Sequence, residues 1–119
     1  STHSYYIYPM ILDPKVLGAS REKIYKALKN EGVQGLTDKY VLLHLYPMYQ
    51  KKIAFGSNKF PWSISKRNIN YKKGICPVAE KLQNETFLGL QIQLFDLTNS
   101  DIIKIISAFH KVWGRLDQL

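Results

Sequence analysis

The sequence has 119 residues, a length suited to one domain, and its 17 Lys and Arg against nine Asp and Glu give a formal charge of +8. Apolar residues make up 45% and charged residues 22%, which is globular rather than disordered composition. No apolar run approaches the roughly 20 residues of a membrane-spanning helix. The single cysteine, Cys76, excludes an internal disulfide and a cysteine-rich zinc site. We therefore expect one cytoplasmic domain over residues 1–119.

The opening segment predicts a strand. Residues 3–12 are rich in aromatic and β-branched side chains, which favour a half-buried strand. Pro9 has no backbone N–H for the ladder, so we expect the strand at a sheet edge or interrupted by a bulge. Asp13-Pro14 and Gly18 then indicate a turn. The first four residues lack a start Met and any signal-peptide pattern, so we expect the chain to begin inside a larger protein.

A helix is predicted from Ser20 to about Glu31. Ser20 is the expected N-cap, Glu22 is favourable in the first turn, and Gly32 suits the position after the helix end. The expected buried face consists of Ile24, Ala27 and Leu28.

The middle of the chain combines an apolar segment with a long loop. Residues 40–46 predict a second strand or extended segment that Pro47 ends, followed by a helical turn over 48–50. Residues 53–76 show no clear period, and a loop of this length is usually functional or poorly ordered. Pro77 suits the first position of a short helix.

The last third predicts a strand and then a helix. Residues 87–95 alternate loosely, as in a strand, and Thr98 is the expected cap of a helix with Asp101 in its first turn. The apolar stripe of this helix is expected at Ile102, Ile106, Phe109, Trp113 and Leu116. The order of elements predicts an α+β fold, with a small, mostly antiparallel sheet packed by helices.

Positive charge is concentrated in one quarter of the chain. Between Gln50 and Ala79 the sequence has seven basic residues and no Asp or Glu. One interpretation is an anion-binding surface for nucleic acid, phosphate or a carboxylated substrate. The other is a solvated loop whose lysines keep the chain soluble. The candidate anion-binding residues are Lys66, Arg67, Lys72 and Lys73.

Aromatic residues are interleaved with these charges. They are Tyr49, Phe55, Phe60, Trp62 and Tyr71. Such rings can stack on the bases of single-stranded nucleic acid, but they also anchor loops onto their own domain. The sequence has no recognised RNA-binding signature and no helix-turn-helix pair, so nucleic-acid binding is the alternative hypothesis.

The sequence offers little support for a self-sufficient enzyme. His3, His44 and His110 are too scattered for a metal motif, so we expect no metal site, and His110 is interpreted as structural or solvated. Cys76 precedes a helix start, where a thiol can be activated, but no base is identifiable nearby and a packing or capping role is favoured. Glycine-rich phosphate loops, nucleophile elbows and paired carboxylates are absent from the sequence. We therefore expect no catalytic residue in this chain.

Several segments carry a family resemblance. Residues 3–8 read His-Ser-Tyr-Tyr-Ile-Tyr, and residues 20–33 run from Ser-Arg-Glu to Glu-Gly-Val. Residues 40–49 contain Tyr, Leu-His, Pro and Tyr, residues 71–82 contain Cys-Pro-Val-Ala-Glu-Lys-Leu, and residues 97–102 read Leu-Thr-Asn-Ser-Asp-Ile. In this order the segments resemble the C-terminal domain of the DegT/StrS sugar aminotransferases, pyridoxal-phosphate enzymes of fold type I, over nearly the whole chain.

The resemblance implies that the chain is the C-terminal small domain of a larger homodimeric enzyme. In this family an N-terminal large domain, absent from this chain, holds pyridoxal phosphate and the Schiff-base lysine. The chain alone is therefore expected to be inactive and to bind no cofactor. The domain would close one side of the substrate cleft, where an amino-acid donor and a keto-sugar, often nucleotide-linked, react. An interaction domain that kept the fold but lost the chemistry is a further alternative.

The same resemblance implies a set of substrate-binding residues. Tyr40, His44 and Tyr49 are expected to border the substrate, with His3 as a further candidate. Tyrosine and histidine can hydrogen-bond sugar hydroxyls while their rings pack on sugar faces. From its charge, the basic loop is expected to approach a nucleotide diphosphate. Replacing His44 by Ala in the intact enzyme is expected to lower turnover and to preserve the fold.

Overall fold

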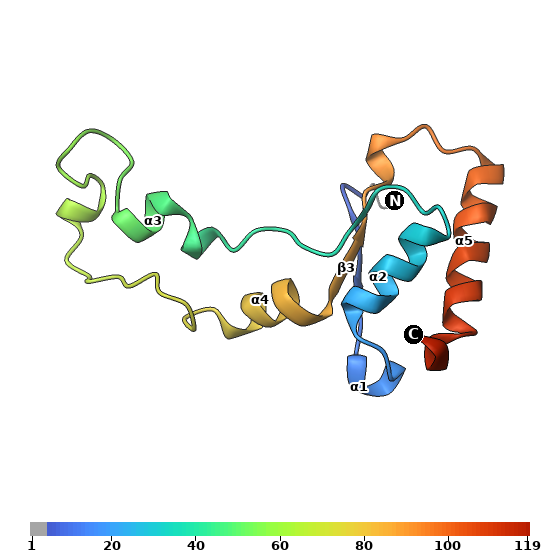
Figure 1. Cartoon of the computed structure of the whole chain (residues 1–119). Helices are drawn as coiled ribbons and strands as arrows, with labels where there is room; N and C mark the ends of the chain where they lie inside the picture. The colour runs from blue at the N-terminus through green and yellow to red at the C-terminus, as the bar shows by residue number, and fades with distance from the viewer. Residues whose placement is uncertain (1–4) are drawn as a thin grey trace. The chain divides into compact units, whose positions relative to one another are not determined.

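The computed structural model describes residues 5–119, which divide into two compact units (Figure 1). The first unit comprises the residues up to Tyr40 together with Leu82–Leu119, and the second unit is Val41–Lys81. Predicted residue His3 lies outside the described residues. Across the described chain, no helix has the length and apolar character needed to cross a membrane.

The first unit is built on a three-stranded antiparallel sheet. Its strands are β1 (Tyr8–Ile11), β2 (Leu36–Thr37) and β3 (Phe87–Leu90), in the order β1-β3-β2. Pro9 lies opposite Gly89 in β1, which is an edge strand, and this confirms the position predicted from its missing N–H. The sheet and its helices confirm the α+β class.

Two strand predictions need correction. Residues 40–46 contain no strand but a 3₁₀ turn, η1 (Leu43–Leu45), and the second strand along the chain is the shorter β2. The side chain of Leu36 in β2 is buried, whereas that of Leu43 is 58% exposed, so apolar composition alone misplaced the strand. The strand predicted over 87–95 ends at Leu90, after which η4 (Ile92–Leu94) turns the chain away.

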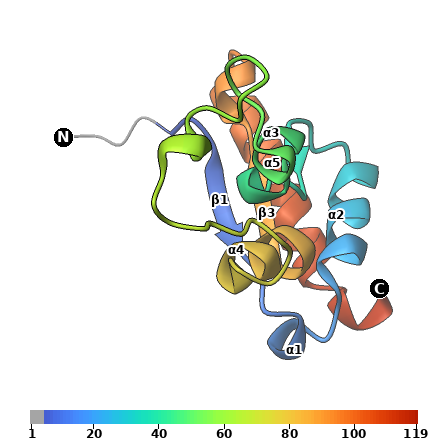
Figure 2. The same ribbon diagram turned by 90° about the vertical axis from the view of Figure 1, so that its left-hand side faces the viewer.

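Three helices complete most of the first unit. They are α1 (Pro14–Leu17), α2 (Arg21–Asn30) and α5 (Asn99–Trp113). The Ser20 side chain caps α2 as predicted, accepting from the Lys23 N–H. Figures 1 and 2 show α2 and α5 on the same side of the sheet. The π-helical turn η3 (Leu82–Thr86) precedes β3, and η5 (Leu116–Gln118) follows α5.

The core lies between this sheet and the two longer helices. Ile24, Leu28 and Leu88 are its fully buried large side chains, which agrees with the buried face predicted for α2. The stripe predicted for α5 is wrong in part: Phe109 and Leu116 pack against the core as predicted, but the buried residues of α5 are Ala108 and Val112. Ile102 is 43% and Ile106 50% exposed. The buried face of α5 is thus centred on Ala108 and Val112, with Ile105 and Phe109 partly buried beside them.

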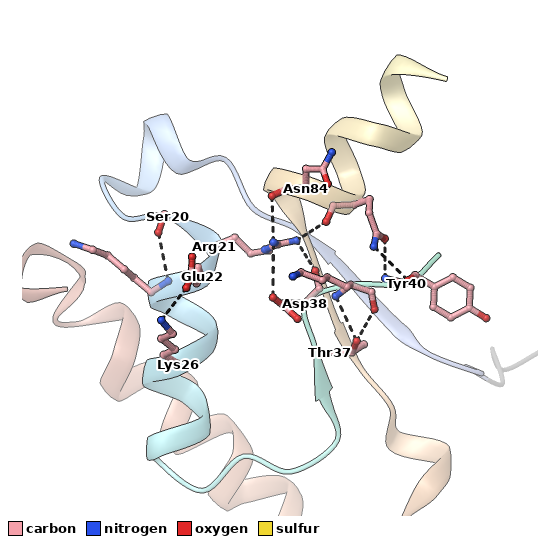
Figure 3. Close-up of polar contacts among 11 residues, drawn as sticks. Ser20, Arg21, Glu22, Lys26, Thr37, Asp38, Tyr40 and Asn84 are labelled. Atoms are coloured by element: carbon pink, nitrogen blue, oxygen red, sulfur yellow. Dashed lines mark hydrogen bonds and ion pairs between the residues drawn. The ribbon is translucent and has the colours of Figure 1, made fainter. Parts of the chain in front are cut away.

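Arg21 anchors the start of α2 to two other segments (Figure 3). Its guanidinium donates to the carbonyl of Asp38, and to those of Gln83 at 2.9 Å and Asn84 at 3.2 Å. The Asp38 carboxylate lies 3.8 Å away. Arg21 is only 6% exposed; the hydrogen bonds of its two terminal nitrogens replace part of its hydration, whereas its Nε is buried without a hydrogen-bond partner among the described residues.

The second unit consists of short elements and a long loop. Its elements are η1, α3 (Pro47–Lys51), η2 (Trp62–Ile64) and α4 (Pro77–Lys81). The helical turn predicted after Pro47 and the helix predicted at Pro77 are both confirmed. Most of residues 53–76 lacks regular structure, as predicted, apart from η2 and a single antiparallel bridge between Phe55 and Phe60.

Candidate functional site

His44 and Glu80 form a buried pair in the second unit. The His44 Nε2 atom lies 3.0 Å from Glu80 Oε1, and the two side chains are 9% and 10% exposed. His44 comes from η1 and Glu80 from α4, 36 residues further along the chain. The pair therefore closes the unit by joining its first and last elements.

The Glu80 carboxylate is held mainly by a backbone donor. The Gly74 N–H donates to Glu80 Oε1 at 2.7 Å. This bond is the chief reason that the pKa of Glu80 is lowered from its ordinary value of 4.5, and the His44 contact also lowers it while burial acts in the opposite direction. Gly74 has a φ of 97°, a conformation that glycine adopts without strain. Glu80 thus acts as an ionised acceptor that fixes the turn before α4.

Gln50 links His44 to the long loop. Its side-chain amide nitrogen donates to the His44 carbonyl at 2.7 Å and to the Tyr71 carbonyl at 2.5 Å. His44 Nε2 is occupied by Glu80, whereas Nδ1 has no hydrogen-bond partner among the described residues. Nδ1 is therefore the ring atom of this largely buried side chain that has no hydrogen bond within the described residues.

Three aromatic rings form the centre of the second unit. Tyr49, Trp62 and Tyr71 lie with centroids 5.2 to 6.5 Å apart, and the indole N–H of Trp62 donates to the Tyr71 hydroxyl at 2.9 Å. All three side chains are half-buried. Predicted site residue Tyr49 therefore belongs to an aromatic cluster that folds the loop onto α3.

Tyr40, predicted beside these residues, belongs to the first unit. Its backbone N–H donates to Gln83 Oε1 at 2.8 Å, and Gln83 Nε2 donates back to its carbonyl at 3.3 Å. Its side chain is 53% exposed. The structure brings His44 and Tyr49 into one unit and fixes the Tyr40 backbone within the other.

The second unit carries nearly all the net charge of the chain. Residues 41–81 contain eight Lys and Arg against the one carboxylate of Glu80, giving +7 of the formal +8. The predicted anion-binding residues Lys66, Arg67, Lys72 and Lys73 are exposed, and none of them forms an ion pair within the described chain. Their positive charge is therefore not neutralised by the protein.

Residues 5–119 contain no cluster of His, Cys, Asp and Glu that could hold a metal ion. Cys76 is half-buried, and its carbonyl accepts the N–H of Glu80 in the first turn of α4.

Sequence reasoning missed the residues that organise the site. Glu80, Gln50 and Gly74 received no role, because each acts through a partner that is distant in sequence or through the backbone. The one available signal was Glu80 itself, the single acid in an otherwise basic segment over 41–81.

Comparison with known proteins finds two partial similarities. The chain is 29% identical over 110 residues to an uncharacterized protein of Methanocaldococcus jannaschii, covering 92% of this chain and 24% of that protein. It is 30% identical over 59 residues to the spore coat polysaccharide biosynthesis protein SpsC of Bacillus subtilis, covering 50% of this chain and 15% of SpsC. The chain thus spans a quarter or less of these relatives. No family model matches the sequence, and no solved structure matches the chain.

Proposed function

We propose that this chain is the C-terminal domain of a pyridoxal-phosphate-dependent aminotransferase that acts on a nucleotide-linked keto-sugar. The observation that carries the proposal is the ordered series of sugar-aminotransferase-like segments along the chain. The similarity to SpsC, a polysaccharide biosynthesis protein, over half the chain supports a role in sugar metabolism. In the intact homodimer, the domain closes the substrate cleft and supports dimerisation.

Local structure gives the resembling segments physical roles. Ser20 caps α2, and the adjacent Arg21 ties this helix to residues 38, 83 and 84. The Cys-Pro segment begins α4, which contains Glu80. Thr98 and Asp101 form a reciprocal capping box at the start of α5. These segments are therefore the points that fix helix starts, which supports a shared domain architecture.

His44 and Tyr49 of the second unit are the proposed sugar-contacting residues. The Glu80 contact fixes the imidazole of His44, so Nδ1 can exchange a hydrogen bond with a sugar hydroxyl without a change of ring position. The Tyr49 ring can pack against a sugar face. These residues orient the substrate and are not proposed to form or break its bonds.

The lysines of this chain do not fit the covalent attachment of pyridoxal phosphate. A Schiff-base lysine is activated by desolvation or by a cationic neighbour in a closed site. Every lysine among the described residues is exposed except Lys52, which is half-buried. The proposal therefore assigns the cofactor and its lysine to the large domain of the intact enzyme, and no chemical step is assigned to this chain.

Borohydride trapping tests whether the lysine that binds the cofactor lies outside this chain. The 119-residue chain, incubated with pyridoxal phosphate and reduced, is expected to yield no stoichiometric adduct at a single lysine. The intact protein treated in the same way is expected to yield one, at a lysine outside this segment. A specific adduct within residues 1–119 would overturn the assignment.

A nucleic-acid-binding module is the second candidate function. The unneutralised basic residues of the second unit favour it, because a cluster of free cations attracts phosphate backbones. Salt-dependent binding of a generic oligonucleotide by the 119-residue chain would support this candidate, and no binding at low salt would remove it.

A further inference from the structure

A small polar pocket opens in the second unit. Its volume is about 210 Å³, and it lies between the end of α3 and residues 68–71 of the long loop. Its walls include Tyr49, Lys52, Asn68, Asn70 and Tyr71. The segments that form it are brought together by Gln50, which donates to the Tyr71 carbonyl.

The pocket presents hydrogen-bond donors. Lys52 lies at the C-terminal end of α3, and its ammonium group is 3.5 Å from Asn68 Oδ1. Asn70 Oδ1 accepts the Lys72 N–H at 2.9 Å, and both side-chain amide nitrogens, of Asn68 and Asn70, lack a partner within the described chain. The two amide groups, and the Lys52 ammonium through the protons not directed at Asn68, can therefore donate to a ligand rich in oxygen acceptors.

The charges in and around the pocket favour an anion among such ligands. The pocket lining contains no Asp or Glu, and Glu80, the one carboxylate of the second unit, is engaged by His44 and Gly74. Exposed cations directly precede or follow three lining residues in sequence: Lys51 before Lys52, Arg67 before Asn68 and Lys72 after Tyr71. With no acid to neutralise these charges, the field at the pocket is positive.

The volume of the pocket and its tyrosine walls indicate which kind of anion fits it. The volume is below the roughly 300–1,000 Å³ of pockets that enclose a whole drug-sized ligand, so this pocket holds one part of a larger molecule. The rings of Tyr49 and Tyr71, with centroids 5.2 Å apart, provide a surface for a sugar or base next to the donors. This pairing suits a phosphate group attached to a ring.

We propose that this pocket binds the diphosphate of a nucleotide-linked sugar, with Lys52, Asn68 and Asn70 donating to phosphate oxygens. The proposal rests on the proposed function, because it identifies where the charged part of the sugar-nucleotide substrate is held. It also defines a binding site that the 119-residue chain possesses by itself.

Two pairs of matched variants test the site. Lys52 and Lys59 both have left-handed backbones, with φ of 53° and 55°, which asparagine tolerates, and Lys59 is exposed and outside the pocket lining. Lys52→Asn therefore removes the proposed ligand contact, and Lys59→Asn removes an equal charge elsewhere. Asn70→Asp keeps the acceptor for the Lys72 N–H but adds a negative charge to the pocket, and Asn58→Asp, at an exposed loop position, is its control.

Binding of uridine diphosphate can be followed through Trp62. Its indole bonds to Tyr71, a pocket wall, and Trp113→Phe leaves Trp62 as the single tryptophan of the chain. We expect saturable binding, competition by pyrophosphate and no binding of uridine. Lys52→Asn and Asn70→Asp are each expected to weaken binding about tenfold or more, and the two controls to change it less than about threefold.

Equal losses in the pocket variants and their controls would overturn the proposal, as would binding of uridine as tight as that of uridine diphosphate. Binding of an oligonucleotide with no competition by uridine diphosphate would also overturn it and would favour the nucleic-acid candidate. A negative result for diphosphate binding at this pocket leaves the proposed aminotransferase role intact, because that role is tested by cofactor trapping and amino transfer in the intact enzyme.

Discussion

The imidazole of His44 and the carboxylate of Glu80 lie 3.0 Å apart and join the first and last elements of the second unit. The chain between them is mostly loop, and few buried apolar side chains stabilise it. This unit therefore depends on polar contacts to a greater degree than the first unit, which has the hydrophobic core.

Removing the Glu80 charge is expected to loosen the second unit in a pH-dependent way. Since the pKa of Glu80 is lowered in the folded state, its carboxylate stabilises the fold above its unfolded value of 4.5, and this contribution is lost as the pH falls below 4.5 and through the folded pKa. Glu80→Gln should reduce stability at neutral pH and flatten the decline in stability as the pH falls below the unfolded value of 4.5. Hydrogen exchange of residues 41–81 measures this, and an unchanged acid profile would contradict it.

His44→Ala separates a binding role from a purely structural one. In the intact enzyme we expect lower turnover, because the variant loses the ring that is proposed to orient the sugar. Glu80→Gln is the matched control, since Gln can still accept the Gly74 N–H while its bond to His44 is weakened. Turnover that falls equally in both variants, in parallel with greater hydrogen exchange of the second unit, would assign His44 a structural role alone.

Arg21→Lys is expected to destabilise the first unit by roughly 1–3 kcal/mol. A lysine ammonium cannot reproduce the planar fork that serves carbonyls of residues 38, 83 and 84, so at least one of these is left without its donor. Chemical denaturation measures the loss. Exposed Arg115→Lys is the control and should change stability by less than about 0.5 kcal/mol.

The orientation of α5 can be tested with two alanine substitutions. Val112 is buried, so Val112→Ala should cost about 1–3 kcal/mol of unfolding free energy. Ile106 is 50% exposed, and Ile106→Ala should cost about 0.5 kcal/mol or less. Thermal unfolding of both variants measures these losses of stability. A larger loss for Ile106→Ala than for Val112→Ala would support the apolar stripe predicted from the sequence.

The capping box of α5 offers a local test. Thr98→Ala removes the acceptor of the Asp101 N–H and should cost about 1 kcal/mol, as helix caps usually do. Ser107→Ala, which removes only an exposed bond to the Ile103 carbonyl within the same helix, should be neutral or slightly stabilising. A smaller effect of Thr98→Ala than of Ser107→Ala on the melting temperature would contradict the assigned cap.

Features encoded by neighbouring residues were predictable from the sequence. Ser20 and Thr98 as caps, Pro9 at a sheet edge and Pro77 at a helix start all act within a few residues. Contacts between residues that are far apart in the sequence were not predictable. The carbonyls that Arg21 binds lie 17 to 63 residues away, and Glu80 is 36 residues from His44. In α5, Ile102 and Ile106 were predicted to be buried but are exposed, because hydrophobicity alone does not distinguish two adjacent apolar faces of a helix.

Amino transfer by the intact protein is the measurement that tests the central proposal most directly. Given pyridoxal phosphate, isotope-labelled glutamate or glutamine and a nucleotide-linked keto-sugar, the intact enzyme is expected to move the labelled nitrogen into the sugar, as mass spectrometry of the product would show. His44→Ala should reduce that incorporation. An intact protein that binds no pyridoxal phosphate and transfers no label to nucleotide-linked keto-sugars would contradict the proposal.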